Sequence, residues 1–395
     1  MNITIISKTI GAPYGASQSG LDLVLACNQS THNVSLIHKY GSSFPKDIDG
    51  YSLNNINVYK APKNYKFQNK INLRSLRRWV DSKFLDSYRI KKLTNLKTDL
   101  VIVNTITGHD IFLDSNLYKN NNSVLVVRES PRHFTFKKDG DIQLEKTKKL
   151  MKIYNKFIFV SSNVMNEWKT IFPYIDNKCF YLPNCIHEKK INNIDLNKKN
   201  KLYESENFNK QNFNIICVAS IQYRKGQDIV LDCIDKIKQK VPNATFHFVG
   251  DYKKNDPYYL KLINHKNYKK FKQNIIFWGK RKDALDLISI SNLFLFPTRA
   301  EALPRVILES MAIKTPIIST DVDGIPEMLN KNNSLLFSIK DTCKMIDSIS
   351  LIYNKKINVK SLIKNAHSDY WENFSRQKQI DRMNYFLDKV YDNEV

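Results

Sequence analysis

Short apolar runs, separated by polar loops and helical segments, divide the chain into two successive sets of predicted strands. In the first half these runs cover residues 3–6, 34–37, 56–59, 100–103, 124–127 and 157–160. In the second half they cover residues 215–218, 245–249, 275–278, 293–296, 316–319 and 335–337. Uninterrupted runs of this length are typical of strands buried on both faces of a parallel sheet. Their alternation with helical segments predicts an α/β protein with two parallel sheets.

The stretch from residue 292 to residue 329 contains two predicted βα units in succession. The strand 293–296 is followed by a polar loop and by a helix in which Pro304 suits the first position, because its missing N–H costs nothing there. The strand 316–319 is followed by a second loop and by a helix that Pro326 would open. Ligands of open α/β sheets bind at the carboxyl ends of the strands. Both loops are therefore predicted to face a ligand.

Two glutamates are the most informative residues of this stretch. Glu301 lies in the first loop, and Glu309 lies on the helix that follows. A helix N-terminus attracts phosphate through its free N–H groups and its partial positive charge. A carboxylate beside that phosphate can bind sugar hydroxyls, and one further along can bind a ribose diol, which suits a nucleotide sugar. The spacing alone is equally compatible with two solvated glutamates on an amphipathic helix.

The order of residues across this stretch resembles a known signature. Glu301-Ala302-Leu303-Pro304 and Glu309-Ser310-Met311-Ala312, followed by residues 316–322 and 324–327, are similar to the E-x7-E signature of glycosyltransferase family 4. That family contains retaining enzymes of the GT-B fold. The resemblance implies two Rossmann-like domains that face each other across a cleft, with a C-terminal helix that crosses back to the first domain. It also implies a nucleotide-sugar donor held mainly by the second domain, an acceptor held mainly by the first, no cofactor and no essential metal.

A second signature follows the strand 215–218. Lys225 precedes Gly226 at a predicted helix start, where it can add a full charge to a phosphate already held by N–H groups. The stretch is similar to the family segment in which an Arg or Ser five residues earlier, here Ser220, binds the diphosphate together with the lysine. The resemblance implies that Glu301 and Lys225 are the catalytic residues. The donor-binding candidates are Glu309, Ser220, Arg224, Gly15, Lys280, Ala302, Leu303, Pro304 and Arg305.

The first half of the chain offers acceptor-side candidates. The turn 11–17 after the first strand contains Gly15, but it lacks the G-x-G-x-x-G pattern and so gives no dinucleotide fingerprint. In a GT-B protein this turn would face the donor phosphates. His109, Glu129 and His133 follow two buried strands, where each could orient an acceptor hydroxyl or accept its proton, or could be a structural loop residue.

Composition also predicts the domain boundaries. Residues 189–212 are rich in Lys and Asn, poor in apolar residues and free of periodicity, which is typical of a linker. We expect an acceptor-binding domain at 1–190, a linker at 191–212, a nucleotide-sugar-binding domain at 213–372 and a crossing helix at 373–395.

The chain departs from the family pattern at four glycine positions, which hold Ala302, Lys314, Asp323 and Cys185. Lys314 is predicted to occupy a left-handed helix cap at a cost of about 1 kcal/mol. Asp323 completes an Asp321-Val322-Asp323 sequence that looks like the D-x-D of metal-dependent transferases. We interpret it as a chance match, because it lies in the second loop and the resemblance implies no essential metal.

The chain of 395 residues carries a formal net charge of +24. Nucleic acid, an anionic membrane surface and a compositional bias towards Lys, Asn and Ile are three explanations. We favour the bias, then membrane contact, and we expect no nucleic-acid partner because no nucleic-acid motif is present. The predicted basic helix at 73–85 is either interfacial or an ordinary surface helix.

Cysteine spacing and hydropathy favour a cytoplasmic location. The six cysteines include no C-x-x-C pair, which excludes the usual zinc spacings and fits reduced thiols. No run approaches the roughly 20 apolar residues of a membrane span. The first ten residues are typical of a strand and lack the pattern of a signal peptide. We expect a cytoplasmic protein, with the inner face of the cytoplasmic membrane as a candidate docking surface.

The predicted function is therefore retaining transfer of a sugar from a nucleotide-diphosphate donor to a saccharide or lipid-linked acceptor, in cell-surface polysaccharide synthesis. A GT-B epimerase or phosphorylase is an alternative with the same architecture. A basic nucleic-acid-binding protein with a decayed transferase site is an alternative from another class.

Overall fold

The computed structural model describes residues 1–10, 15–29, 32–41, 44–53, 55–61, 88–89, 91–119, 122–192, 194 and 208–391. The basic helix predicted at 73–85 and most of the predicted linker lie outside these residues.

The first domain is built on a parallel sheet with the strand order β5-β2-β1-β6-β7-β8-β9. These strands are β1 (Asn2–Ile10), β2 (Asn33–Gly41), β5 (Asn57–Lys60), β6 (Leu100–Asn104), β7 (Asn122–Val127), β8 (Lys156–Phe159) and β9 (Cys179–Tyr181). A small antiparallel ladder pairs β3 (Asp47–Ile48) with β4 (Tyr51–Ser52). The helices are α1 (Gly15–Asn28), α3 (His109–Asp114), α4 (Gly140–Met151), α5 (Ser162–Ile171) and α6 (Glu188–Asn192), with 3-10 helices η1 (Ile106–Gly108), η2 (Pro131–Phe136) and η3 (Pro173–Lys178).

The second domain is built on a parallel sheet with the strand order β12-β11-β10-β13-β14-β15. These strands are β10 (Phe213–Val218), β11 (Ala244–Val249), β12 (Ile275–Gly279), β13 (Leu293–Phe296), β14 (Ile317–Thr320) and β15 (Leu335–Phe337). The helices are α8 (Gln227–Lys240), α9 (Pro257–Ile263), α10 (Lys266–Lys270), α11 (Ala284–Ile290), α12 (Arg305–Ala312), α13 (Thr342–Tyr353) and α14 (Val359–Asn373). The 3-10 helices are η4 (Tyr223–Lys225), η5 (Lys272–Asn274) and η6 (Ile325–Glu327).

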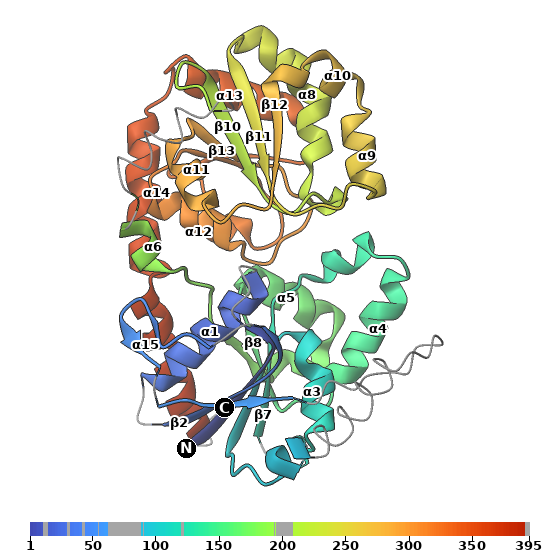
Figure 1. Cartoon of the computed structure of the whole chain (residues 1–395), viewed down its shortest axis with the longest axis vertical. Coiled ribbons are helices and arrows are strands. Elements are labelled where there is room, and N and C mark those ends of the chain that lie inside the picture. The colour runs from blue at the N-terminus through green and yellow to red at the C-terminus, as the bar shows by residue number, and fades with distance from the viewer. Residues whose placement is uncertain are drawn as a thin grey trace, which may run out of the picture.

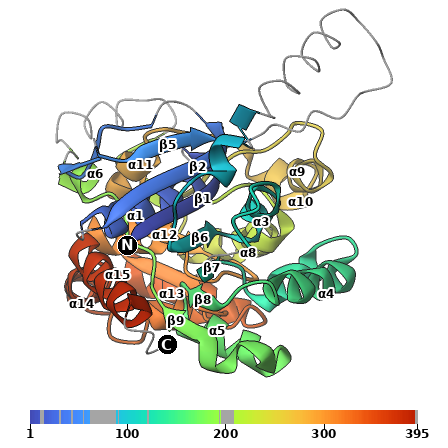
Figure 2. The same cartoon turned by 90° about the horizontal axis from the view of Figure 1, so that it is seen from below.

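The two Rossmann-like domains confirm the predicted α/β architecture, and the C-terminal helix crosses between them as expected. Figure 1 shows the domains one above the other, with α14 running down one side from the second domain. The last helix, α15 (Arg376–Tyr391), packs against α1 of the first domain. Figure 2 shows α14 and α15 from below, at the same edge of the molecule.

Several predicted boundaries need correction. β1 continues to Ile10 because the equally long β2 pairs with it up to Gly41. β9 was not predicted as a strand, although its residues Cys179, Phe180 and Tyr181 are apolar; it is only three residues long and partly buried. Pro304 has an extended backbone and precedes α12 as its N-cap, so it is not the first helical residue. Pro326 lies in the short 3-10 helix η6 and opens no α-helix.

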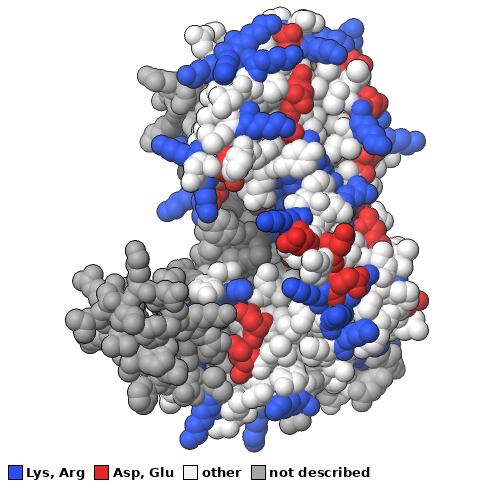
Figure 3. Space-filling model, turned by 90° about the vertical axis from the view of Figure 1, so that its right-hand side faces the viewer, with Lys and Arg blue, Asp and Glu red and all other residues white. Residues whose placement is uncertain are grey.

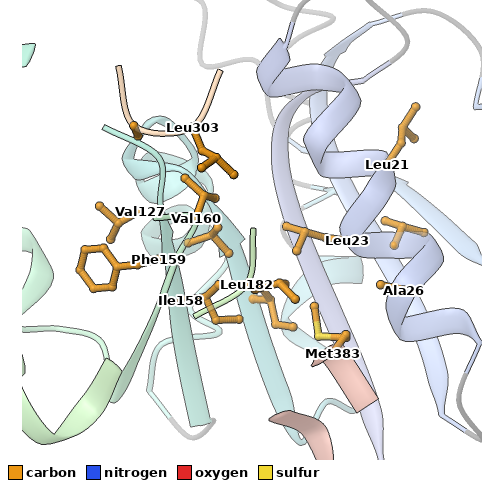
Figure 4. Close-up of a cluster of buried hydrophobic side chains, with 14 of the residues drawn as sticks. Leu21, Leu23, Ala26, Val127, Ile158, Phe159, Val160, Leu182, Leu303 and Met383 are labelled. Atoms are coloured by element: carbon orange, nitrogen blue, oxygen red, sulfur yellow. The ribbon is translucent and has the colours of Figure 1, made fainter. Parts of the chain in front are cut away.

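A continuous apolar core joins the two domains. Leu303, at the loop before α12, is only 3% exposed and belongs to the same buried cluster as Val127 and Val160 of the first domain. Figure 4 shows Leu303 beside Val160, with Met383 of α15 reaching the same group of side chains. The backbone oxygen of Leu303 also accepts a hydrogen bond from Asn184 Nδ2 at 2.7 Å. The start of α12 is thereby fixed against the first domain.

Surface charge is distributed over both domains. On the face shown in Figure 3, Lys and Arg side chains cover the upper and lower domains and are interspersed with Asp and Glu. Among the described residues, no helix combines the length and the apolar character that crossing a bilayer requires.

A buried ion cluster links the domains beside this core. Asp22 of α1 pairs with Arg305 of α12 and, at 2.7 Å, with Arg376 of α15. Arg376 also lies 3.3 Å from Asp49. Burial alone would raise the pKa of Asp22, but Arg305 and Arg376 hold that pKa well below its usual range. Asp22 therefore remains a carboxylate that pairs with both α12 and α15.

Replacement of Asp22 by Ala should destabilise the protein strongly. Removing one partner of a buried ion pair leaves uncompensated charge and typically costs about 3–5 kcal/mol, here reduced by the contact that Asp49 keeps with Arg376. The free energy of unfolding in urea measures the loss. Asp347→Ala is the matched control, because the Lys240–Asp347 pair is 48% and 60% exposed and such pairs contribute about 0–1 kcal/mol.

The pH dependence provides a second measurement on the same variant. The pKa of Asp22 is depressed in the folded state, so its contribution is present above its unfolded value of about 4 and is lost as pH falls towards the folded value. The difference in unfolding free energy between wild type and Asp22→Ala should therefore shrink below pH 4. A difference no larger than that of Asp347→Ala at neutral pH would contradict a structural role for the cluster.

Candidate active site between the domains

The order in which strands are added to the second sheet reverses between the adjacent strands β10 and β13. β11 and β12 extend from one side of β10, whereas β13, β14 and β15 extend from the other. β10 and β13 are parallel neighbours, so the loops that follow them leave the sheet at the same edge. Such a switch point is where open α/β sheets form a ligand crevice.

Close backbone contact holds these two loops together. Gly226 has a φ of +73°, and a Cβ atom there would lie 1.9 Å from the carbonyl oxygen of Pro297. The carbonyl oxygen of Arg224 accepts hydrogen bonds from the Arg299 N–H at 2.7 Å and from Thr298 Oγ1 at 3.1 Å. The absence of a side chain at residue 226 therefore allows the loop after β10, which contains Lys225, to lie against the loop after β13, which contains Glu301.

Lys225, Arg224 and Glu301 meet at this contact. Glu301 Oε1 accepts a hydrogen bond from Lys225 Nζ and lies 2.9 Å from Arg224 NH1. The three side chains are only 13–17% exposed. Burial, reinforced by the Arg224 guanidinium, lowers the pKa of Lys225 well below its usual range. An arriving dianion would raise that pKa again and would receive charge-assisted hydrogen bonds.

The start of α12 adds backbone donors to the same place. Pro304 is its N-cap, and no side chain caps the first turn. The N–H groups of an uncapped first turn favour an anion. Glu309 lies one turn inside the helix and is partly buried.

Two acceptor-side candidates of the first domain are influenced by the charges of this group. Burial, followed by the charges of Arg224, Lys137 and Lys225, lowers the pKa of His133 to about 4, so its imidazole is neutral at pH 7. Burial raises the pKa of Glu129, and Arg128, Lys137 and Arg224 partly offset this effect. Because Arg224 influences both groups, they lie within electrostatic range of the donor-side cations. The charge of Arg224 thus acts on both residues, and that of Lys225 acts on His133.

Four predicted residues have other surroundings. His109 is buried, and its Nδ1 atom forms a 2.9 Å hydrogen bond with the Tyr154 hydroxyl, so it packs within the first domain. Arg305, expected at the donor, instead directs its guanidinium to Asp22. The Leu303 side chain enters the interdomain core. Lys280 is exposed in the loop after β12, two strands away from β10.

The remaining candidates lie close in sequence to strands or helices already described. Ser220 follows β10, and its carbonyl oxygen accepts a hydrogen bond from Gln227 Nε2 at 3.1 Å. Ala302 is 5% exposed, next to Glu301. Gly15 is the first residue of α1, the helix whose Asp22 contacts Arg305.

The contacts of Asp323 were not predicted from the sequence. Its Oδ2 atom accepts hydrogen bonds from the Glu301 N–H at 2.8 Å and from Ser130 Oγ at 2.9 Å. The departure from a family glycine was the available signal, and we interpreted it as a chance D-x-D. Asp321 is exposed whereas the Asp323 side chain is fully buried. Within the described ranges, no three His, Cys, Asp or Glu residues are grouped so as to hold a metal ion.

Comparison with known proteins identifies the second domain. Residues 212–355 match the family model described as "Glycosyl transferases group 1". The chain is 26% identical over 255 residues to an uncharacterised glycosyltransferase of Methanocaldococcus jannaschii, an alignment that covers 60% of this chain and 59% of that protein. It is 25% identical over 249 residues to the capsular polysaccharide biosynthesis glycosyltransferase CapH of Staphylococcus aureus, covering 61% and 64%. The alignments thus span about 60% of the length of these relatives.

Solved structures show the fold of the whole chain. The Anabaena protein HepE, in complex with UDP and glucose, superposes with a TM-score of 0.74 at 18% identity and covers 98% of this chain and 99% of its own. Sucrose-phosphate synthase from Thermosynechococcus elongatus superposes with a TM-score of 0.74 at 14% identity and covers 100% of both chains. The chain therefore has the GT-B fold, and residues 212–355 of its second domain are similar to the glycosyl transferases group 1 family.

Proposed function

We propose that this protein is a retaining glycosyltransferase of the family 4 type, which moves a sugar from a nucleotide-diphosphate donor to a saccharide or lipid-linked acceptor. The observation that carries the proposal is the contact of Arg224 and Lys225 with Glu301 at the switch point of the second sheet. The match of residues 212–355 to a glycosyltransferase family supports it independently.

In this proposal the second domain stabilises the leaving group. Lys225, Arg224 and the first-turn N–H groups of α12 would bind the diphosphate as negative charge develops on it. Preorganised donors that are shielded from water are worth more than the same donors in solution. They supply the charge stabilisation that a metal ion provides in other transferases, so we propose that catalysis requires no metal.

The two glutamates would divide the recognition of the donor. Glu301 would bind hydroxyls of the donor sugar, and Glu309 the ribose diol. The anomeric carbon–oxygen bond to the diphosphate breaks while the bond to the acceptor oxygen forms on the same face. The acceptor hydroxyl proton passes to the departing phosphate oxygen, which accounts for retention without a protein nucleophile.

The first domain would position the acceptor. Glu129, whose pKa is raised, and the neutral His133 face the donor-side cations and are suited to orienting an acceptor hydroxyl. CapH and several other relatives are named for cell-surface polysaccharides, so we propose an acceptor of that class, with contact to an anionic membrane where the acceptor is lipid-linked.

A donor screen tests the function directly. Purified protein should hydrolyse, or transfer from, one class among UDP-, GDP- and ADP-sugars, with thermal stabilisation by the matching diphosphate. The released sugar should initially have the anomeric configuration of the donor, as measured by NMR, and EDTA should leave the rate unchanged. Inversion of configuration, loss of activity in EDTA, or a reaction that requires only inorganic phosphate and a glycan would contradict the proposal.

Replacement of Glu309 by Ala should weaken donor binding. Loss of a charge-assisted hydrogen bond to a ribose hydroxyl costs about 1.5–3 kcal/mol, which corresponds to roughly a ten- to hundredfold rise in donor KM. Steady-state kinetics on the donor from the screen measure the change. Glu372→Ala, at an exposed position of α14, is the control and should behave as wild type. An unchanged donor KM in Glu309→Ala would rule out the ribose role.

A further inference from the structure

The loop between β14 and η6 carries an aspartate whose contacts are unlike those of a metal ligand. We infer that Asp323 is a positioning residue, which couples Ser130 and the start of η2 in the first domain to the backbone of Glu301. The inference rests on the proposed function, because it assigns a task to Asp323 within that reaction.

Asp323 joins groups from the two domains through one oxygen atom. Its Oδ2 accepts from the Glu301 N–H at 2.8 Å and from Ser130 Oγ at 2.9 Å. Its Oδ1 lies 3.4 Å from Arg132 Nε, again in the first domain. The Asp323 side chain has no exposed surface. A buried carboxylate that loses a donor bears the full cost of desolvation, so the two hydrogen bonds to Oδ2 are strongly favoured to stay in place.

The backbone at this position favours glycine. Asp323 has a φ of +48°, in the left-handed region that costs a residue with a side chain about 1 kcal/mol. Strain of this kind is retained where the surroundings enforce it, and it clusters at functional sites. A carboxylate at a strained position, bonded to the residue beside the reacting sugar, points to a role that a glycine would not fill.

The neighbouring residue fixes the loop against Glu301 a second time. The Gly324 N–H donates to the Glu301 carbonyl oxygen at 3.2 Å. A Cβ at residue 324 would lie 1.7 Å from the Ala302 carbonyl oxygen and 2.6 Å from Ser161 Oγ. Both backbone polar groups of Glu301 are thus bonded to residues 323 and 324, and the absence of a side chain at residue 324 allows this close contact.

Glu327 anchors the same loop to the first domain. Its carboxylate accepts from the N–H groups of Ser162 at 3.0 Å and Asn163 at 2.7 Å, at the N-terminus of α5. A carboxylate at this end of a helix is favoured by the free N–H groups and the helix dipole. Asn163 Nδ2 also donates to the Asp323 carbonyl oxygen at 3.3 Å. The loop therefore keeps its place between the domains while Asp323 bonds to both.

These contacts have a consequence for the proposed reaction. Glu129 and His133, the acceptor-side candidates, flank Ser130 in sequence. Asp323 consequently sets the distance between the acceptor-side loop and the carboxylate that would hold the donor sugar. Asp323 bonds to the backbone of Glu301 and to Ser130, and so it acts through these residues. Loss of its carboxylate should impair the chemical step more than donor binding.

The experiment compares the full-length protein with Asp323→Gly, Asp323→Asn, Ser130→Ala and the double variant Asp323→Gly/Ser130→Ala. Asp321→Asn is the matched control, because Asp321 is exposed and is the other acid of the D-x-D. Tm is measured for each protein, together with kcat and KM for hydrolysis of UDP-glucose, GDP-mannose or ADP-glucose, whichever the wild type uses.

Asp323→Gly should keep its Tm within about 3 °C of wild type, because relief of strain and of the buried charge offsets the lost bonds. Its kcat should fall about tenfold or more, the effect of losing a hydrogen bond to a charged group, while donor KM changes about twofold or less. Asp323→Asn keeps an acceptor oxygen and should recover most of kcat. The double variant should be no slower than Asp323→Gly, because the two residues act as one unit.

Normal kcat in Asp323→Gly would overturn the inference, as would additive effects in the double variant. A loss of activity that merely follows a large fall in Tm would also overturn it, since that result describes a structural residue. Equal losses in Asp321→Asn and Asp323→Asn, restored by Mg²⁺, would assign the D-x-D to a metal instead. If the wild type neither binds nor hydrolyses any nucleotide sugar, the proposed function fails first, and the role of Asp323 fails with it.

Discussion

The contact between the loops that follow β10 and β13 depends on one electrostatic constraint: two basic side chains are buried against a single carboxylate. Arg224 and Lys225 both contact Glu301 Oε1, and all three side chains are almost excluded from water. Such an arrangement is costly without a further anion, because burial disfavours each charged form. Burial and the nearby charge of Arg224 lower the pKa of Lys225, which is a sign of that cost. A diphosphate at the uncapped start of α12 would supply the missing negative charge, as the proposed function requires.

The same loops also hold the two domains together. Leu303 packs in the first-domain core, and Arg305 pairs with Asp22. Asp323 accepts a hydrogen bond from Ser130. Residues next to the proposed donor site therefore serve as the interdomain contact. Domain separation would disturb the geometry around Glu301, because Asp323 bonds to both Ser130 and the Glu301 N–H.

The sequence predicted those features that arise from local patterns. Residues 293–296 and 335–337 form strands with the predicted bounds, because buried parallel strands leave a clear apolar run. Lys225 and Glu301 lie together as their positions after neighbouring strands indicated. Lys314 has the predicted left-handed conformation, with a φ of +64°.

What the sequence did not predict depends on contacts between distant residues. Arg305 was expected at the donor, but its partner Asp22 lies 283 residues away in the chain. Asp323 looked like part of a metal motif, because nothing near it in the sequence identifies Ser130 as its partner. Periodicity and motif spacing describe one element at a time, whereas these side chains are positioned by the docking of the two domains.

The most direct test of this account is the affinity of the free protein for a nucleoside diphosphate, compared with the parent nucleoside, in wild type and in Lys225→Met. Isothermal titration calorimetry gives both values. Because charge-assisted hydrogen bonds dominate the proposed contact, the diphosphate should bind wild type about a hundredfold more tightly than the nucleoside, and Lys225→Met should lose about tenfold of that preference. Equal affinity for the two ligands, or a Lys225→Met variant that keeps the full preference, would contradict it.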